Sequence, residues 1–175
     1  MRRLALWIVA ALAVAAVVHY VTLMDTPGFI MKRVMMKMGE ANTIHHQGRV
    51  TAASRGVVRP SPDLLYSVCP FDLTNGALHV TAPVPPGTYW SVSLFDAQTN
   101  NFFVKNDKDA KGKVDLLLTT PYVDVKRPAG AQEVVAPTPK GLVLFRTLIN
   151  KEEDFAAIDA VRRKANCTFI RSHAS

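Results

Sequence analysis

The spacing of apolar positions divides the chain into a helical N-terminal part and a β-rich remainder. Residues 4–18 form an unbroken apolar run that continues with few polar interruptions to residue 24, and Arg2 and Arg3 precede it. Two basic residues followed by about 20 apolar ones are typical of a membrane anchor or an export signal. We therefore predict that residues 1–24 are a transmembrane anchor or signal.

The processing of this segment stays open. The triplet Ala13-Val14-Ala15 suits signal cleavage, but the chain stays apolar to Val18 and again at 21–24, which favours a retained anchor; a soluble core helix is the third alternative. Basic residues flank the run on both sides, so the positive-inside count is nearly tied. A very short leader normally stays in the cytoplasm. We therefore expect a single-pass inner-membrane protein whose domain faces the periplasm.

Residues 25–55 are expected to form an amphipathic linker helix and a loop. Spacings of three and four place five apolar side chains on one helix face, namely Ile30, Met31, Val34, Met35 and Met38. Pro27 suits the first turn of such a helix. Three interpretations stay open: a helix packed on its own domain, a helix on the membrane surface, or a Met-rich partner contact.

From residue 56 onward, short strands alternate with turn signals. The expected strands are 56–59, 64–71, 77–82, 88–95, 101–105, 114–119, 122–127, 132–136, 141–149 and 166–171. Asn75-Gly76 between two of them predicts a β-hairpin. The pattern predicts one mainly β domain over 56–175, an antiparallel β-sandwich of jelly-roll-like type.

One surface helix is expected near the C-terminus of this domain. Asn150 suits its N-cap, and the acidic residues 152–154 suit its first turn. Phe155 and Ile158 begin its inward stripe, and the basic residues 162–164 complement its C-terminal end. We interpret the charges of this helix as those of a solvated face.

The formal charge of +7 is concentrated beside the apolar run. Residues 1–58 carry five more basic than acidic residues, whereas residues 59–175 carry only two more. A nucleic-acid-binding domain would show a basic stripe with interleaved aromatic residues, and none is found here. We therefore expect inner-membrane lipid, and no nucleic acid, as a partner, because the excess charge suits anionic headgroups.

Strand 141–149 contains a candidate site. Both of its faces are apolar, yet Arg146 lies in the middle of one. A guanidinium in apolar surroundings needs a carboxylate or several other acceptors, and Asp63, Asp72 and Asp96 are available. Either an internal ion pair stabilises the sandwich, or Arg146 faces a cleft and holds an acidic or polyhydroxy ligand.

Residues that carry other chemistry are few. Cys69 and Cys167 are a candidate disulfide in an oxidising compartment, with two separate buried thiols as the alternative. His45 and His46 adjoin, but no further ligand completes a metal set. No phosphate loop, nucleophile elbow or paired helical histidine motif is present, so we predict no cofactor, no metal and no catalytic residue.

Six segments of the β-rich part form a recognisable series. They are Arg59-Pro-Ser-Pro-Asp63-Leu-Leu-Tyr66-Ser67, Phe71-Asp72-Leu73, Gly87-Thr-Tyr89-Trp90, Leu94-Phe95-Asp96-Ala-Gln-Thr-Asn100-Asn101-Phe102, Ala136-Pro-Thr-Pro139 and Leu144-Phe-Arg146-Thr-Leu148. The series resembles the uncharacterised bacterial family DUF1254 over residues 56–171. The resemblance implies a β-sandwich without an assigned activity. Its matching polar positions are our candidate ligand-binding residues: Asp63, Tyr66, Asp96, Asn100, Asn101 and Arg146.

Two departures from the family pattern matter. Ser61 and Leu64 replace an Asn and a Thr that are common in longer members, which weakens any transferred polar site. Longer members also carry a second β-rich domain, which is not found before Ser175. The resemblance therefore implies a partner, and we expect a second small membrane-anchored β-rich chain to supply that domain.

Three classes of function remain. The first is a membrane-anchored interaction module that docks a partner chain. The second is a domain that binds a polar or acidic small molecule, glycan or lipid headgroup at Asp63, Asp96 and Arg146. The third is an envelope enzyme with Asp63 and Asp96 as acid and base. The lack of a catalytic motif makes the third the least favoured.

Overall fold

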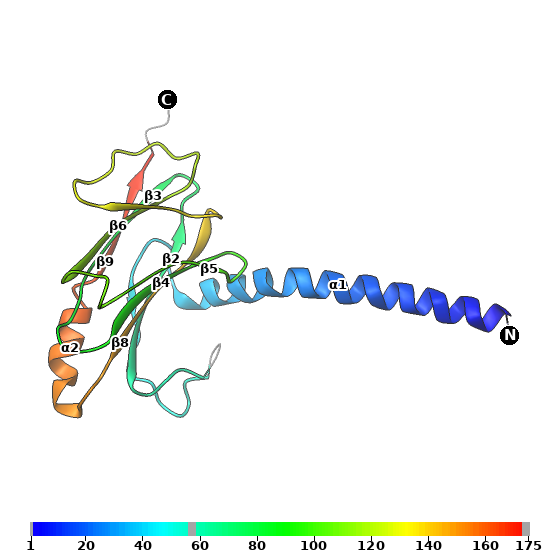
Figure 1. The fold of residues 1–175 in the computed structure, drawn as a ribbon, viewed down its shortest axis with the longest axis horizontal. Helices are drawn as coiled ribbons and strands as arrows, with labels where there is room; N and C mark the ends of the chain where they lie inside the picture. The colour runs from blue at the N-terminus through cyan, green and yellow to red at the C-terminus, as the bar shows by residue number, and fades with distance from the viewer. Residues whose placement is uncertain (1, 56–58, 173–175) are drawn as a thin grey trace.

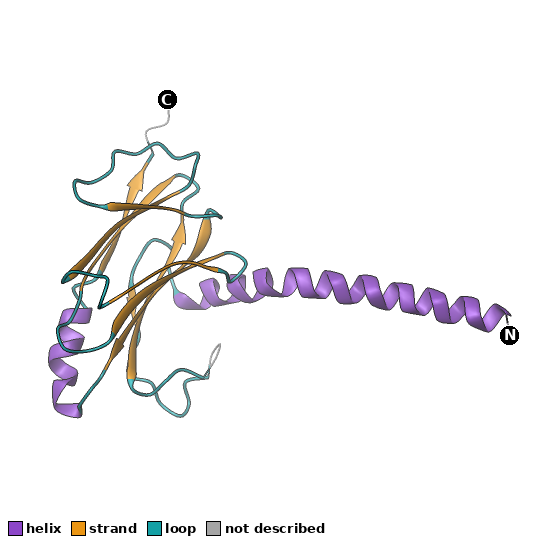
Figure 2. Cartoon of the chain, in the orientation of Figure 1, coloured by secondary structure: helices purple, strands orange, loops and turns teal. Residues whose placement is uncertain are grey.

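A long helix projects from one side of a β-sandwich in this computed structural model, which describes residues 2–55 and 59–172 (Figure 1). Two helices, a short 3₁₀ segment and nine strands make up the described chain (Figure 2). In chain order they are α1 (Arg2–Met38), β1 (His45–His46), β2 (Leu64–Asp72), β3 (Gly76–Pro83), β4 (Trp90–Asp96), β5 (Asn101–Asn106), β6 (Lys113–Thr119), β7 (Gln132–Val135), β8 (Lys140–Leu148), η1 (Glu152–Asp154), α2 (Phe155–Arg162) and β9 (Asn166–Arg171).

The strands form two sheets that pack face to face. Sheet A has the order β1-β2-β8-β4-β5, and sheet B has the order β7-β6-β3-β9. All strand pairs are antiparallel except β6 and β7, which run parallel. The predicted mainly β sandwich with a C-terminal helix is confirmed, and the parallel pair is the one departure from the antiparallel expectation.

The core lies between the two sheets. Alternate residues of each strand point inward, so that Phe71, Trp90 and Phe145 are each at most 2% exposed. The rings of Trp90 and Phe145 have their centroids 6.1 Å apart. Cys69 of β2 and Cys167 of β9 form a disulfide across this core, with their Cα atoms 6.8 Å apart. The disulfide therefore joins sheet A to sheet B.

The hairpin predicted at Asn75-Gly76 is wrong. β2 belongs to sheet A and β3 to sheet B, so this turn carries the chain from one sheet to the other. Gly76 lies against β9, because a Cβ at this position would be 2.2 Å from the carbonyl oxygen of Ile170. The glycine is thus needed for a close approach of two backbones and not for a two-residue turn.

The predicted strand 122–127 is also wrong. This segment belongs to the connection between the parallel strands β6 and β7, which has to return along the sheet. Val123 and Val125 pack against a small cluster around Leu117, which explains their alternating pattern. The short strand β1 was not predicted, and most of the predicted strand 56–59 lies outside the described residues.

α1 is one uninterrupted helix, although the sequence predicted that a new helix begins near Pro27. Pro27 lies inside α1, where it lacks an N–H group to donate to the preceding turn. The helix ends at Met38 because Gly39 adopts φ 105°. A Cβ on Gly39 would lie 2.5 Å from the ring of His45, so a glycine is required at this end.

The last three turns of α1 cross the outer face of sheet A from the β5 side to the β1 side. Gly28 lies against Gln98 in the turn between β4 and β5, and Gly39 lies against His45 of β1. Between these points is the α1–sheet A contact, an apolar cluster of Met31, Val34, Val68 and Leu142. Of the three interpretations of this segment, packing on its own domain is confirmed for this face.

We expect Met31→Ala to weaken the α1–sheet A contact by about 2 kcal/mol, because a buried methionine loses its packing. Met31 is 5% exposed, whereas Met36 on the open face of the same helix is 69% exposed. Met36→Ala is therefore the matched control and should change stability by less than about 0.5 kcal/mol. Chemical denaturation of both variants in the same detergent tests this. Equal losses in the two variants would contradict it.

Candidate functional site

Asp63 and Asp96 lie at opposite ends of β8. Leu64, which follows Asp63, pairs with Leu148, whereas Asp96 pairs with Gly141. The seven steps along β8 from Gly141 to Leu148 correspond to about 23 Å at roughly 3.3 Å per residue. The two carboxylates therefore cannot act on one reacting atom. The hypothesis of an Asp63–Asp96 acid–base pair is wrong, and so is that of a shared ligand cluster containing both.

Asp96 is a structural residue of the β4–β5 turn. It is 5% exposed, and its Oδ1 accepts hydrogen bonds from the backbone N–H groups of Gln98 and Asn100 at 2.8 and 2.9 Å. Its Oδ2 accepts from the side-chain amide of Asn100 at 3.0 Å. Asn101 follows as the exposed first residue of β5. These hydrogen bonds use both carboxylate oxygens of Asp96 and stabilise the β4–β5 turn, which lies against Gly28 of α1.

Tyr66 and Arg146 lie side by side on the outer face of sheet A, next to the α1–sheet A contact. They are register partners on β2 and β8, and Ser91 of β4 is the register partner on the other side of Arg146. The phenol oxygen of Tyr66 accepts a hydrogen bond from the backbone N–H of Ser61 at 3.0 Å. The six predicted residues are thus divided into Asp96, Asn100 and Asn101 in one turn, Tyr66 and Arg146 on one face, and Asp63 apart from both.

Arg146 has no carboxylate within 4 Å among the residues that the structure describes. Its Nη2 donates to Oγ of Ser93 at 3.0 Å. Its Nε is buried and donates no hydrogen bond within the described chain. The predicted internal ion pair of Arg146 is therefore wrong.

Arg162 is the buried arginine that sequence reasoning missed. It is 4% exposed, although it was interpreted as part of a solvated helix end. Its Nη1 donates to three acceptors, the carbonyl oxygens of Gln47 and Tyr66 and Oγ of Ser67, at 3.1, 2.7 and 3.2 Å. Its Nε and Nη2 donate to Oδ1 of Asp159. Arg162 thereby links α2 to the edge of sheet A.

The sequence spacing of α2 could have indicated that Arg162 is buried. Phe155, Ile158 and Arg162 follow one another at intervals of three and four, so Arg162 continues the inward stripe of α2. The predicted N-cap is also wrong. The amide of Asn150 donates to the carbonyl oxygen of Gly87 at 2.9 Å, and a 3₁₀ turn precedes α2.

Asp159 and His46 are the titratable neighbours of Arg162. Burial opposes ionisation of Asp159, but hydrogen bonds from Arg163 and Arg162 outweigh it and lower the pKa of this carboxyl group. Burial, and then the positive charges of Arg162 and Arg163, lower the pKa of His46. Nδ1 of His46 lies 2.8 Å from Oγ of Ser67, which already accepts from Arg162. The O–H of Ser67 can therefore donate to Nδ1 of a neutral His46.

We expect the domain to lose stability as the pH falls below about 6.5, the ordinary pKa of histidine. The pKa of His46 is lower in the folded chain, so the unfolded chain binds the proton first and acid favours unfolding. One such group changes the free energy of unfolding by at most about 1.4 kcal/mol per pH unit. Urea denaturation between pH 7 and 5 should show a shallower dependence for His46→Asn. Identical slopes would contradict the assignment.

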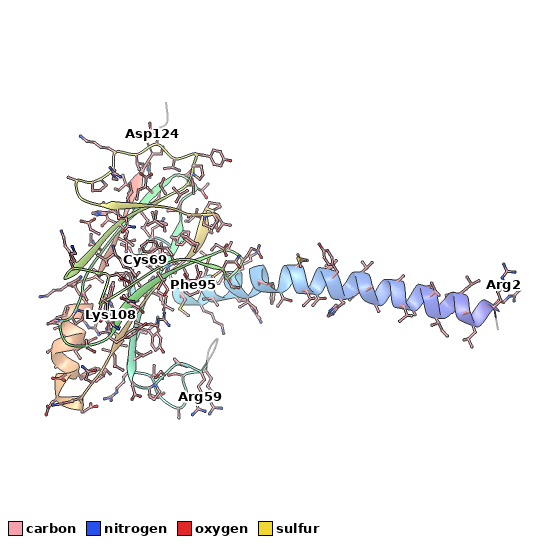
Figure 3. All side chains as sticks on the ribbon, viewed as in Figure 1. Arg2, Arg59, Cys69, Phe95, Lys108 and Asp124 are labelled. Atoms are coloured by element: carbon pink, nitrogen blue, oxygen red, sulfur yellow. A yellow bond between two sulfur atoms is a disulfide. The ribbon has the colours of Figure 1, made fainter. Side chains whose placement is uncertain are left out.

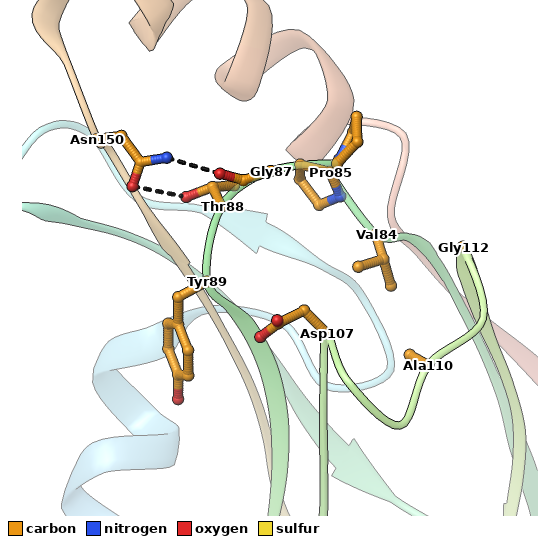
Figure 4. Close-up of a pocket in the computed structure, with 10 residues that line it drawn as sticks. Val84, Pro85, Gly87, Thr88, Tyr89, Asp107, Ala110, Gly112 and Asn150 are labelled. Carbon is orange, nitrogen blue, oxygen red and sulfur yellow. Dashed lines mark hydrogen bonds between the residues drawn. The ribbon is translucent and has the colours of Figure 1, made fainter.

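Arg146 lines neither of two open hollows on the surface of the described residues. One of about 500 Å³ is lined by residues 84–89 with Asp107, Ala110, Gly112 and Asn150 (Figure 4). Its polar groups bond to the protein itself, since Asp107 accepts from the backbone of Trp90 at 3.3 Å and Asn150 contacts Gly87 and Thr88. The other, of about 780 Å³, adjoins Asp72 and Arg171. Asp72 there is paired with Lys140 at 3.0 Å.

The first hollow lacks a pair of carboxylates for acid–base chemistry, whereas the second is lined by Glu40 and Asp72, of which Asp72 is paired with Lys140. Asp107 is the one ionisable carboxylate that lines the first, whereas acid–base catalysis commonly uses two groups of different pKa. Among the described residues, no group of three His, Cys, Asp or Glu side chains is placed to hold a metal ion. Two buried side-chain atoms among the described residues have no hydrogen-bond partner, Nε of Arg146 and Oγ1 of Thr147, and of these two side chains only that of Arg146 is charged.

The β-sandwich is the fold of an uncharacterised protein family. The model of DUF1254, a protein of unknown function, matches residues 41–169. This is more than half of the chain, which therefore belongs to that family. The match begins three residues after α1 ends and includes β1, so it covers the sandwich and leaves the long helix outside.

Two solved structures share this fold. The VPA0106 protein from Vibrio parahaemolyticus is 14% identical with a TM-score of 0.60, over 84% of this chain and 38% of that one. An uncharacterised protein from Burkholderia cenocepacia is 16% identical with a TM-score of 0.52, over 75% of this chain and 36% of that one. The chain thus spans little more than a third of either protein. No curated protein sequence matches it.

Proposed function

We propose that the chain is a single-pass membrane protein whose β-sandwich works as an interaction module on the periplasmic side. One observation carries the proposal, namely that α1 is continuous from an exposed apolar stretch into the α1–sheet A contact. The most apolar 18-residue window of α1 has a mean hydropathy of 2.3, and none of it is buried. Residues 4–24 would extend about 31 Å as a helix, which matches a hydrocarbon core of about 30 Å.

The same continuity supports a retained anchor over a cleaved signal. Met31 and Val34 cover sheet A and belong to the same helix as the apolar stretch. A cut after Ala15 would leave an apolar helical stub, including the exposed Val17, Val18 and Leu23, attached to the domain in water. Retention in a bilayer gives these side chains an apolar environment.

The attachment of α1 also determines which side of the domain is near the bilayer. Gly28 at the β4–β5 turn is four residues beyond Met24, or about 6 Å along the helix axis. The headgroup layer on each side is roughly 5–8 Å thick. We propose that the β4–β5 turn lies at the headgroups. Figure 3 shows Arg59 on a loop at the lower end of the sandwich, below the inner end of α1.

The proposed interaction role is the docking of a further β-rich partner. This chain matches only 38% and 36% of the two solved proteins, so in those proteins the shared fold is one part of a longer chain. We propose that the sandwich here is likewise joined by further β-rich structure, from a separate membrane-anchored chain. An alternative, the binding of an acidic ligand, is favoured by the lack of a carboxylate partner for Arg146 among the described residues.

Cell fractionation tests the anchoring. The full-length chain should stay in the membrane after alkaline carbonate washing, with its N-terminus intact by mass spectrometry. Leu12→Arg should release part of it, because a central arginine costs about 3 kcal/mol for insertion. Alkaline phosphatase fused after Ser175 should be active only if the domain is outside the cytoplasm. A chain that is soluble in the cytoplasm would overturn the proposal.

Affinity purification tests the docking. The tagged chain, extracted in a mild detergent, should retain a β-rich membrane protein at a constant ratio. The Leu12→Arg variant is the matched control, because a partner anchored beside α1 should be lost with the anchor. Repeated recovery of this chain alone would overturn the docking role and leave the anchoring untouched.

A further inference from the structure

We propose that Arg146 is the centre of an oxyanion-binding site on the outer face of sheet A, which takes a carboxylate or a phosphate group. Arg146 is half-buried, with Nε inaccessible to water and without an acceptor among the described residues. A cation that is partly removed from water is stabilised by a counter-charge, and the described chain provides none within 4 Å.

The groups around Arg146 suit an anion. Ser93 accepts from Nη2 of Arg146, and the hydroxyl of Tyr89 donates to Oγ of Ser91 at 2.9 Å. Ser91 and Ser93 are 1% and 0% exposed, whereas Tyr89 is 41% exposed. The N–H groups of the guanidinium that have no acceptor lie on the same face of sheet A as these hydroxyl groups. A planar guanidinium binds the two oxygens of a carboxylate or phosphate in a bidentate manner.

Arg162 and Arg146 differ in the acceptors that the described chain provides for their guanidinium groups. Arg162 is more deeply buried, and it has a carboxylate and three further acceptors within the chain. Arg146 has one neutral acceptor, and its side chain remains partly exposed to solvent. The chain thus satisfies one buried arginine itself and leaves the other for an external group.

If α1 is anchored as proposed above, Arg146 lies too far from the bilayer to bind the phosphate groups of the surrounding lipids. β8 is two strands from β5, or about 10 Å at roughly 4.8 Å per strand. The β4–β5 turn is already about 6 Å beyond the hydrocarbon core. Arg146 therefore lies about 16 Å from the core, past a headgroup layer of roughly 5–8 Å. The anion is one in solution or one presented by a partner.

Anion titration of the full-length chain in maltoside micelles tests the proposal. Sodium acetate and inorganic phosphate, compared with chloride at equal ionic strength, should raise the thermal unfolding midpoint with saturation in the millimolar range. Arg146→Met should abolish the saturable part, and Arg146→Lys should weaken it about tenfold, because an ammonium cannot bind in the bidentate manner. Arg127→Met is the charge-matched control, since Arg127 is 58% exposed, and should respond like the wild type.

Three outcomes decide the proposal. A wild-type response to neither probe would overturn it, as would an equal response in Arg146→Met that folds normally by circular dichroism. If Arg146→Met does not fold, Arg146→Lys carries the comparison. The second arm repeats the titration in nanodiscs that contain phosphatidylglycerol. If the response to the added anions is lost only in these nanodiscs, lipid phosphate fills the site. That result would overturn the assignment of the site to an anion from solution or from a partner. The micelle arm does not depend on membrane insertion, so its failure and that of the proposed anchoring are distinguishable.

Discussion

Replacing Arg162 by Ala is expected to destabilise the sandwich by about 3–5 kcal/mol, because it leaves buried polar groups without partners. The carbonyl oxygens of Gln47 and Tyr66 would lose a charged donor, and the segment after β1 would lose its link to α2. A small domain has a total stability of about 5–15 kcal/mol. The loss should therefore be evident as a lower midpoint in urea denaturation.

Arg163→Ala is the matched control for this prediction. Arg163 shares the carboxylate of Asp159, at 2.7 Å, but its side chain is 55% exposed. Exposed ion pairs contribute about 0–1 kcal/mol, so this variant should remain close to the wild type. If the two variants lose equal stability, the effect comes from the general charge of the helix end and not from the buried contacts of Arg162.

Much of the fold was predictable because periodicity reports which side chains are buried. Eight of the ten predicted strands lie within or overlap the strands from β2 to β9, and Phe155 and Ile158 do pack inward. What failed is the pairing of distant segments. Asn75-Gly76 has the local chemistry of a hairpin, yet β2 pairs with β8, about 75 residues away. Such pairing depends on the whole core and not on the turn.

The candidate site was less predictable for the same reason. The sequence indicated that Arg146 is unusual, but its register next to Tyr66 and Ser91 decides which partners it has. Asp63 and Asp96 belong to the same sequence series as Arg146, and the strand directions place them at opposite ends of β8. A charge pattern can identify a residue that needs a partner, whereas only the register identifies the partner.

Reduction of the Cys69–Cys167 disulfide should lower the stability of the domain by about 4–5 kcal/mol. The bond closes a loop across 98 positions, and cross-linking a loop of this length restricts the unfolded chain by about that amount in the chain-entropy model. The effect should be large because the bond joins the two sheets, whose strands otherwise pair only within each sheet. Denaturation with and without a phosphine reductant measures it.

The double variant Cys69→Ala, Cys167→Ala distinguishes the effect of losing the disulfide from other effects of the reductant. It should be as unstable as the reduced wild type, apart from a small packing loss at Cys69, and it should not respond to reductant. Thiol titration of the unfolded, unreduced wild type should find none of its two cysteines free. Two free thiols in protein taken directly from the membrane would contradict the disulfide and, since such bonds persist in oxidising compartments, would also weigh against a periplasmic domain.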